Sequence, residues 1–252
     1  MDPIVKVEHL TKTFKSRGRE DYTAVDDVNF SLYPGEKLAI IGESGSGKTT
    51  VVNMLTRLLY CTSGRILLDG EDITNVRGKA LREIYRKVQM VFQTPVESFD
   101  PRRTLGDGIS ESLVNHGMKK KEAMQEAIRL LSLCGLEDEF AKRYPHEVSG
   151  GQCQRAAIAR AFAIKPKVLI LDEATSALDV TVQEEVLNLL TKIKEEMDIS
   201  YLFICHDIAL VQNFCDRVLV MYQGRIVEEG IPDEVILHPK EEYTKNLIDS
   251  VL

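Results

Sequence analysis

A glycine-rich stretch near the start of the chain carries residues that could bind a polyphosphate. It follows the apolar residues 38–41 and comprises Gly42, Glu43, Ser44, Gly45, Ser46, Gly47, Lys48, Thr49 and Thr50. Glycines at this spacing let the backbone wrap closely around an anion and point N–H groups at it. The spacing is that of a P-loop, which predicts a nucleotide site.

Two side chains at the end of this loop suit the chemistry of a nucleoside triphosphate. Lys48 can reach the β- and γ-phosphates of ATP, and the hydroxyl of Thr49 can hold Mg²⁺. A helix that starts near Lys48 adds the positive end of its dipole. A glycine-serine turn without a nucleotide is the alternative. The apolar strand before the loop and the helix-compatible residues 51–59 after it favour the site for ATP and Mg²⁺.

Two adjacent acids, Asp172 and Glu173, end a second apolar run over residues 167–171. Such a run is typical of a strand buried on both faces of a parallel sheet, and ligands bind at the carboxyl ends of these strands. We therefore expect both acids beside the phosphate loop. Asp172 can support the Mg²⁺ shell, and Glu173 can orient or deprotonate an attacking water. The alternative is an N-cap pair for a following helix.

Gln93 and His206 each follow a further predicted strand, over residues 88–92 and 200–205. The imidazole of His206 could bind the γ-phosphate and position the water, and Gln93 could be a ligand to the metal and water. Taken alone, the two residues are equally compatible with a solvent-facing loop histidine and a polar strand end.

The elements that position these residues alternate between strand and helix patterns. Alternating apolar residues predict antiparallel strands over 5–14 and 24–32, and helical spacing predicts a helical insert at roughly 94–148. The expected fold class is α/β: a mostly parallel sheet with an antiparallel β subdomain and a helical subdomain. It forms a single domain, 1–252, with a C-terminal tail from roughly 231.

Composition limits the remaining classes of function. The chain has 252 residues and a net charge of −7, which argues against nucleic acid as a ligand. No apolar run approaches the roughly 18 residues of a membrane span, and no signal-peptide layout is present. The sequence thus predicts a cytoplasmic protein that meets a membrane through a partner. The five cysteines lack a Cys-x-x-Cys pair, which favours reduced structural thiols.

A second glycine motif follows Val148 and consists of Ser149, Gly150, Gly151 and Gln152. A hydroxyl, a close-approach glycine backbone and a helix starting at about Gln152 together predict a second anion site. With this motif, the chain resembles the nucleotide-binding subunit of an ABC transporter, which has a P-loop NTPase core. The resemblance covers nearly the whole length, and its motifs occur in the family's order: the phosphate loop, Gln93, the glycine motif, the acidic strand, residues 176–179 and His206.

The resemblance implies roles that the residues alone do not. The second glycine motif closes over the ATP held by the opposite subunit, so a second ATPase chain, homologous or identical, is a partner. Gln93 links the nucleotide to the transmembrane partner, and Asp179 joins the nucleotide-binding set. Phe14 matches the aromatic position that stacks on adenine, where Tyr is usual. Tyr22 is the other candidate, and a core position for Phe14 is the alternative.

Within the family, residues 145–147, 92–95 and 176–183 resemble the oligopeptide, dipeptide and nickel importer group. Pro239, Tyr243-Thr244 and Leu247 match that group's C-terminal signature, although two glutamates replace its His-Pro. Other departures are Val148 in place of Leu and Cys153 in place of a basic residue. The implied function is ATP hydrolysis that powers import of small peptides or chelated metal. The implied partners are transmembrane permease subunits and, indirectly, a solute-binding protein, with this chain at the cytoplasmic face of the inner membrane.

Three other classes of function are alternatives to an importer of peptides or metal. An ABC ATPase of DNA repair or translation would usually carry long coiled coils or tandem copies, which 252 residues do not hold. Another solute, imported or exported, would leave the ATPase chemistry unchanged. A P-loop kinase or GTPase would give the second glycine motif no task.

Overall fold

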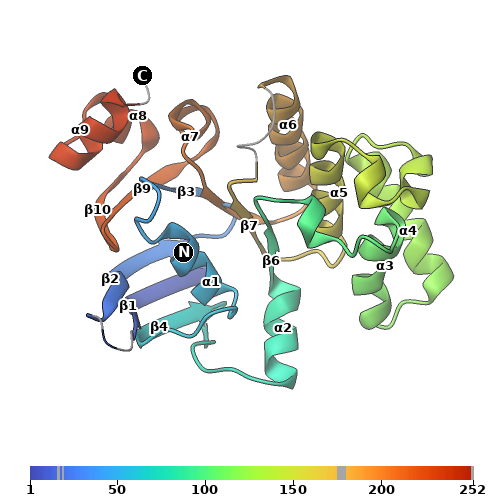
Figure 1. The fold of residues 1–252 in the computed structure, drawn as a ribbon, viewed down its shortest axis with the longest axis horizontal. Coiled ribbons are helices and arrows are strands. Elements are labelled where there is room, and N and C mark those ends of the chain that lie inside the picture. The colour runs from blue at the N-terminus through green and yellow to red at the C-terminus, as the bar shows by residue number, and fades with distance from the viewer. Residues whose placement is uncertain (16–17, 19, 175–179, 251–252) are drawn as a thin grey trace.

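The computed structural model describes residues 1–15, 18, 20–174 and 180–250. Two sheets organise this part of the chain: a four-stranded sheet in the order β2-β1-β4-β5 and a six-stranded sheet in the order β10-β9-β3-β8-β7-β6. Figure 1 shows the four-stranded sheet on one side of the molecule and the helices α3, α4 and α5 on the other. This is the predicted α/β fold.

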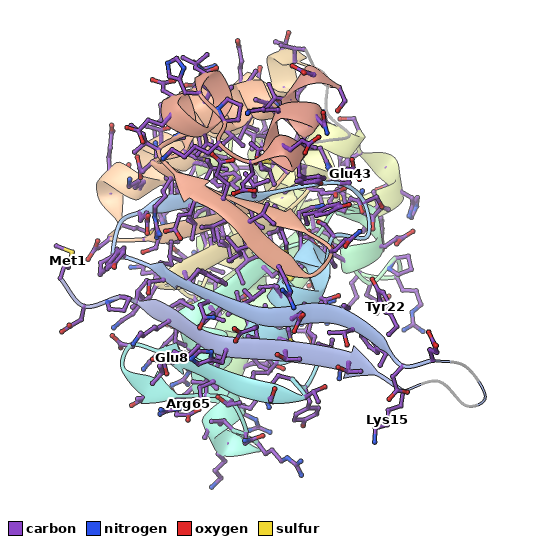
Figure 2. All side chains as sticks on the ribbon, turned by 90° about the vertical axis from the view of Figure 1, so that its left-hand side faces the viewer. Met1, Glu8, Lys15, Tyr22, Glu43 and Arg65 are labelled. Atoms are coloured by element: carbon purple, nitrogen blue, oxygen red, sulfur yellow. The ribbon has the colours of Figure 1, made fainter. Side chains whose placement is uncertain are left out.

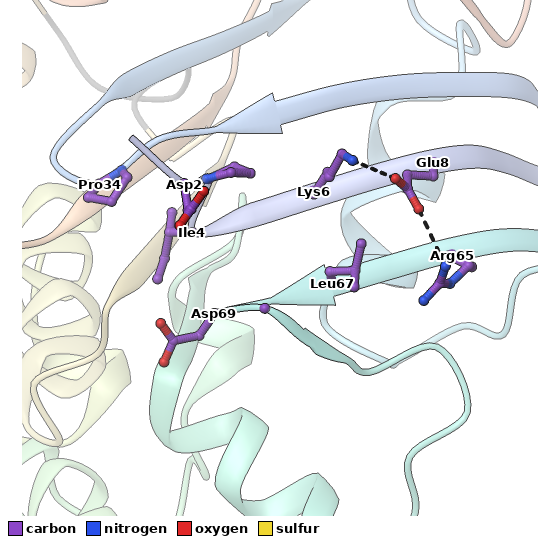
Figure 3. A pocket seen from close by; sticks show the side chains of 10 residues that line it. Asp2, Ile4, Lys6, Glu8, Pro34, Arg65, Leu67 and Asp69 are labelled. Carbon is purple, nitrogen blue, oxygen red and sulfur yellow. Dashed lines mark ion pairs between the residues drawn. The ribbon is translucent and has the colours of Figure 1, made fainter.

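The smaller sheet is antiparallel, and alternation along its strands separates a buried face from an exposed one. Its strands are β1 (Val5–Phe14), β2 (Tyr22–Leu32), β4 (Ser63–Leu68) and β5 (Glu71–Asp72). Val7, between Phe30 and Ile66 in register, is buried with both of them. On the exposed face Glu8 pairs with Lys6 at 2.6 Å and with Arg65 at 3.8 Å, so charge links β1 to β4 (Figure 3).

The larger sheet is parallel except at its last strand. β3 (Lys37–Ile41) lies between β8 (Ser200–Ile204) and β9 (Arg217–Tyr222). β7 (Val168–Asp172) lies between β8 and β6 (Val88–Val91). β10 (Arg225–Gly230) forms an antiparallel hairpin with β9. Every residue of β7 and β8 is buried. The unbroken apolar runs reflect this burial on both faces.

Helices cover the larger sheet and build two cores that meet at β3. Leu38 and Ile40 belong to the core shared with the smaller sheet, whereas Ala39 and Ile41 belong to the core shared with α3, α4 and α5. The described α-helices are α1 (Lys48–Leu55), α2 (Lys79–Lys87), α3 (Leu105–Asn115), α4 (Lys120–Leu133), α5 (Gly150–Phe162), α6 (Val180–Glu196), α7 (Ile208–Phe214), α8 (Pro232–Leu237) and α9 (Glu242–Asp249). Short 3₁₀ turns occupy Val96–Ser98, Asp138–Lys142 and Pro145–Glu147.

Local caps explain where the helices depart from the expected positions. The helix after the phosphate loop ends at Leu55 rather than near residue 59, because Arg57 adopts a left-handed φ of 60°. α5 starts at Gly150, two residues before Gln152, because the Ser149 hydroxyl accepts a hydrogen bond from the Gln152 N–H and caps the helix. Four helices, α2, α7, α8 and α9, were not predicted.

The junction of β1 and β4 yields a test of close backbone packing. Gly64 has a φ of +94°, and an added Cβ would lie 2.3 Å from the carbonyl oxygen of His9. Gly64→Ala should lower the free energy of unfolding by ~3 kcal/mol or more. The strain of a left-handed backbone at alanine adds to the cost of displacing the β1 backbone. Gly70→Ala is the control, because its φ of +78° is similar but no atom lies within 4 Å. It should cost only ~1–2 kcal/mol in urea unfolding. Equal losses would contradict the packing argument.

Candidate nucleotide-binding site

The phosphate loop connects the end of β3 to the start of α1, and its glycines are needed for conformation and for space. Gly42 has a φ of +149° and Gly47 a φ of +109°. An added Cβ on Gly42 would lie 2.2 Å from the Met221 carbonyl oxygen, and one on Gly47 would lie 2.4 Å from that of Ala24. The loop is therefore seated on β2 and β9, with no room for a side chain at either position.

Lys48 is only 4% exposed and directs its ammonium back into the loop. Its Nζ donates hydrogen bonds to the carbonyl oxygens of Gly42 (2.7 Å) and Glu43 (2.8 Å). Burial lowers the pKa of Lys48, and the negative charges of Glu173 and Asp172 oppose part of that shift. The loop thus holds a cation where a polyphosphate would lie.

A cavity of 190 Å³ opens over the loop and reaches both aromatic candidates. Phe14 and Tyr22 face each other across β1 and β2, and they are 41% and 57% exposed. This exposure argues against a core position for Phe14 and leaves both rings accessible to a base. Figure 2 shows Tyr22 and Glu43 on the same side of the molecule, away from Met1. The cavity is lined by Phe14, Tyr22, Ala24, Ser44, Gly45, Gly47, Lys48, Thr49, Thr50 and Glu173.

Three polar side chains from the ends of neighbouring strands meet beside this loop. Gln93 follows β6, Glu173 follows β7 and His206 follows β8. Gln93 Nε2 donates to Glu173 Oε2 at 2.6 Å, and His206 Nε2 lies 2.7 Å from Glu173 Oε1. Each of the three was predicted to follow a strand, and the carboxyl ends of parallel strands share one edge of the sheet. The contacts among the three side chains were not predicted. The described part of α6 is Val180–Glu196.

Asp172 is the residue whose surroundings suit a divalent cation. It is 7% exposed, and its Oδ1 has no hydrogen-bond partner among the described residues. Burial raises the pKa of Asp172 to about 6, with the neighbouring charge of Glu173 adding to the shift. Carboxylate and hydroxyl oxygens are the ligands that Mg²⁺ prefers, so Asp172 together with Thr49 fits this ion.

The second glycine motif lies at the start of α5 and does not line the cavity over the phosphate loop. Ser149 and Gln152 form a capping box, in which Gln152 Oε1 accepts from the Ser149 N–H at 3.0 Å. An added Cβ on Gly150 would meet no atom within 4 Å. The motif is thus an open helix N-terminus, separate within this chain from the loop. Asp179 lies outside the described residues.

One contact to the loop was missed at the sequence level. The backbone N–H of Glu43 donates to the hydroxyl of Tyr243, at a distance of 3.0 Å. Tyr243 stood out in the sequence as part of a C-terminal signature. No local pattern connects residues 200 positions apart, and only the docking of α9 brings them together.

The cavities away from the phosphate loop include two that are lined by charged residues. One of 580 Å³ opens on β1 and β4, where the hydrogen bond from Lys6 lowers the pKa of Glu8 against the effect of burial (Figure 3). The other, of 290 Å³, lies beside α3 and includes Phe99, Arg103 and Arg160. Neither contains the convergent acids, lysine and glycines of the smaller cavity, so size does not identify the site.

Comparison with known proteins agrees with this geometry. The model of the family described as ABC transporter matches residues 25–176. The chain is 44% identical over 257 residues to the glutathione import ATP-binding protein GsiA of Pectobacterium atrosepticum, covering 99% of this chain and 41% of GsiA. It is 41% identical over 252 residues to the dipeptide transport ATP-binding protein DppF of Lactococcus lactis, covering 98% of this chain and 81% of DppF.

A solved structure extends the comparison to the fold. The dimeric, post-hydrolysis ATP-binding cassette MJ0796, bound to ADP and Pi, superposes with a TM-score of 0.83 at 33% identity, covering 90% of this chain and 98% of that one. The chain belongs to the ABC transporter family, and its fold is that of an ATP-binding cassette, as the resemblance implied. Within the described residues, no helix has the length and apolar character needed to cross a bilayer.

The raised pKa of Asp172 predicts a pH-dependent effect of its replacement. In the folded protein the pKa of Asp172 is about 6, above the ordinary aspartate value of 3.8. Ionisation of Asp172 therefore destabilises the fold, and this loss of stability develops as the pH rises from about 4 to about 6. Asp172→Asn should therefore raise the Tm of the nucleotide-free protein by roughly 2–6 °C at pH 8, and by less at pH 4.5. Scanning calorimetry at both pH values measures this, with the exposed Asp2→Asn as control. An equal gain at both pH values would contradict the assignment.

Proposed function

We propose that this chain is the ATP-hydrolysing subunit of a transporter that imports small peptides through a membrane permease. The observation that carries the proposal is the position of Glu173. Its two carboxylate oxygens contact Gln93 and His206 beside the buried ammonium of Lys48. A carboxylate held in this way next to a phosphate loop suits activation of a water for attack on a γ-phosphate.

Binding of ATP is assigned to the loop and the two exposed aromatics. The loop N–H groups and the start of α1 face the phosphates, and the Lys48 ammonium neutralises their charge. The exposed rings of Phe14 and Tyr22 offer a stacking surface for adenine. Lys12 Nζ lies 5.0 Å from the centre of the Phe14 ring, within the range of a cation–π contact.

Mg²⁺ is proposed as the metal ion, held by Thr49, Asp172 and Gln93. The buried Oδ1 of Asp172, which has no hydrogen-bond partner among the described residues, supports this assignment. When bound, the ion would neutralise charge on the phosphate oxygens. The described residues include no cluster of three or more His, Cys, Asp or Glu suited to a metal, which agrees with an ion held mainly through oxygens of the loop and nucleotide.

In this proposal, Glu173 is the residue that positions and deprotonates the attacking water. Gln93 and His206 contact the two oxygens of the carboxylate, and the proposed role of His206 includes a contact to the γ-phosphate. Asp172 stays apart from this network, since neither Gln93 nor His206 bonds to it among the described contacts. The two adjacent acids therefore take different tasks because they have different partners.

A second chain would complete each site. Ser149, Gly150 and Gly151 form an open helix N-terminus that lies away from this chain's own cavity, so the motif is free to cover a nucleotide on a partner. The dimeric state named for the cassette MJ0796 supports this arrangement. Asp179 is proposed to lie at the same interface.

Glu173→Gln should preserve ATP binding and slow hydrolysis by ~10²- to 10⁴-fold, because the amide keeps the shape of the side chain but cannot accept the proton. An ATP-dependent dimer should accumulate in gel filtration, and adding Ser149→Arg should abolish that dimer. The exposed Glu122→Gln serves as control and should hydrolyse ATP like the wild type. Normal turnover by Glu173→Gln would show that the base lies elsewhere.

Import of peptides is favoured over import of chelated metal because the relatives described above are named for glutathione and dipeptide transport. We place the permease against the groove beside α3, which Gln89 of β6 also lines. In this groove Arg103 pairs with Glu111 at 2.7 Å and Arg160 stacks on Phe99. A solute-binding protein would deliver the peptide, and this chain would lie at the cytoplasmic face of the membrane.

Reconstitution of the chain with its co-purified membrane partners in vesicles tests the transport function. Labelled di- and tripeptides should accumulate in an ATP-dependent manner, and vesicles that carry Glu173→Gln should not accumulate them. Uptake of Ni²⁺ without uptake of peptides would favour the metal-importing alternative. Purification with nucleic acid and without a membrane protein would overturn the transporter assignment.

A further inference from the structure

The hydroxyl of Tyr243 reaches the phosphate loop from the far end of the chain. It accepts a hydrogen bond from the Glu43 N–H at 3.0 Å. That N–H belongs to the peptide unit whose carbonyl oxygen, on Gly42, accepts from Lys48 Nζ at 2.7 Å. In a trans peptide the N–H and C=O point in opposite directions. Tyr243 and Lys48 therefore hold one peptide plane from its two sides.

This peptide plane is one that the loop alone would not fix firmly. Gly42 has a φ of +149°, in the region that only glycine enters readily, and Glu43 is exposed. Rotation of the plane would turn the Gly42 oxygen away from Lys48 and remove one of the two carbonyls that bind its ammonium. The bond to Tyr243 opposes that rotation, because the N–H would lose its partner when the oxygen moved.

Tyr243 can act in this way because it is itself held in place. Its ring stacks on that of Tyr222, with centroids 4.0 Å apart and planes 28° from parallel. The start of α9 is anchored to β10 by Glu228, whose carboxylate accepts from the N–H groups of Lys240 (2.9 Å) and Glu241 (3.2 Å). Leu247 and Ile248 of the same helix are buried in the core.

The protonation states of these groups favour the contact. Burial raises the pKa of Tyr243, so its hydroxyl stays neutral and can accept from the Glu43 N–H. Burial opposes ionisation of Glu228, but the hydrogen bonds that its carboxylate accepts from the backbone N–H groups of Lys240 and Glu241 leave its pKa lowered. Glu228 is thus charged at neutral pH and suits the positive end of α9.

We infer that Tyr243 is a positioning residue for nucleotide binding: its hydroxyl fixes the Gly42–Glu43 peptide and, through that peptide, the position of the Lys48 ammonium. The inference rests on the proposed function only in taking ATP as the ligand. It makes α9 a structural part of the nucleotide site, and it gives the Tyr-Thr pair of the C-terminal signature a physical task.

Tyr243→Phe isolates the hydroxyl, since the phenyl ring preserves the stack on Tyr222. Loss of one neutral hydrogen bond corresponds to ~1 kcal/mol, or a roughly fivefold weaker binding of ATP. The KM for ATP should rise by about this factor while kcat changes less than about twofold, because Glu173 and its partners are untouched. Equilibrium titration with ATP and steady-state hydrolysis measure the two quantities.

Tyr222→Phe is the matched control. It removes a hydroxyl from the other ring of the same stack, where the partner is Gln223 Nε2 at 3.0 Å rather than the loop. Its affinity and KM for ATP should equal those of the wild type. Thermal unfolding without nucleotide should give the same Tm for both variants, which separates an effect on the loop from general destabilisation.

Amide hydrogen exchange at Glu43, followed by NMR without nucleotide, tests the contact independently of ATP. Exchange should be faster in Tyr243→Phe than in the wild type and unchanged in Tyr222→Phe. Faster exchange with no loss of ATP affinity would overturn the positioning role, and unchanged exchange would overturn the contact itself. A wild-type protein that failed to bind ATP would refute the proposed function while the exchange result still reported on Tyr243.

Discussion

The site depends on keeping the ammonium of Lys48 buried inside a loop. Removing a charged amine from water is costly unless hydrogen bonds and opposite charge replace its hydration. Here two backbone carbonyls supply the hydrogen bonds, and the nearby carboxylates of Asp172 and Glu173 supply the charge. Glycines turn the carbonyls inward, and the order of strands β3, β8 and β7 brings the acids to the same edge. Both conditions must hold for the lysine to face a phosphate.

The two adjacent acids at the carboxyl end of β7 differ in backbone conformation and in side-chain contacts. Asp172 is the last residue of β7 and stays in the buried interior, whereas Glu173 adopts a left-handed φ of 49°. Its N–H donates to the Ile204 oxygen at 2.8 Å, which keeps the chain beside β8 through this turn. A non-glycine residue in this conformation is strained, and such strain is typical of functional positions. The turn carries the side chain of Glu173 to Gln93 and His206, while that of Asp172 remains without a partner among the described residues.

The parts of the structure that were predictable are those that a single strand or turn determines. Apolar runs such as Val168–Asp172 indicated buried parallel strands, and the glycine spacing indicated the phosphate loop. The sequence indicated that Gln93, Glu173 and His206 each follow a strand, but it did not predict the contacts among the three side chains. Helix ends were less predictable, because the left-handed residue Arg57 ends α1 early and the Ser149 cap starts α5 early. Contacts between distant segments left no local pattern, and the bond from Glu43 to Tyr243 is of this kind.

A loop that needs glycine to fold around an anion cannot derive its rigidity from its own side chains. The C-terminal part of the chain supplies that rigidity here. The N–H of Gly224, in the turn between β9 and β10, donates to the Ser46 oxygen at 2.9 Å, and the Met221 backbone packs against Gly42. The outer side of the loop is thus fixed by residues 221–243, and its inner side is left to Lys48 and the phosphates. Because Tyr243 and Lys48 bond to the same peptide unit, between Gly42 and Glu43, a movement of α9 would shift one of the carbonyls that Lys48 contacts. Affinity for the nucleotide therefore depends on segments that never touch it.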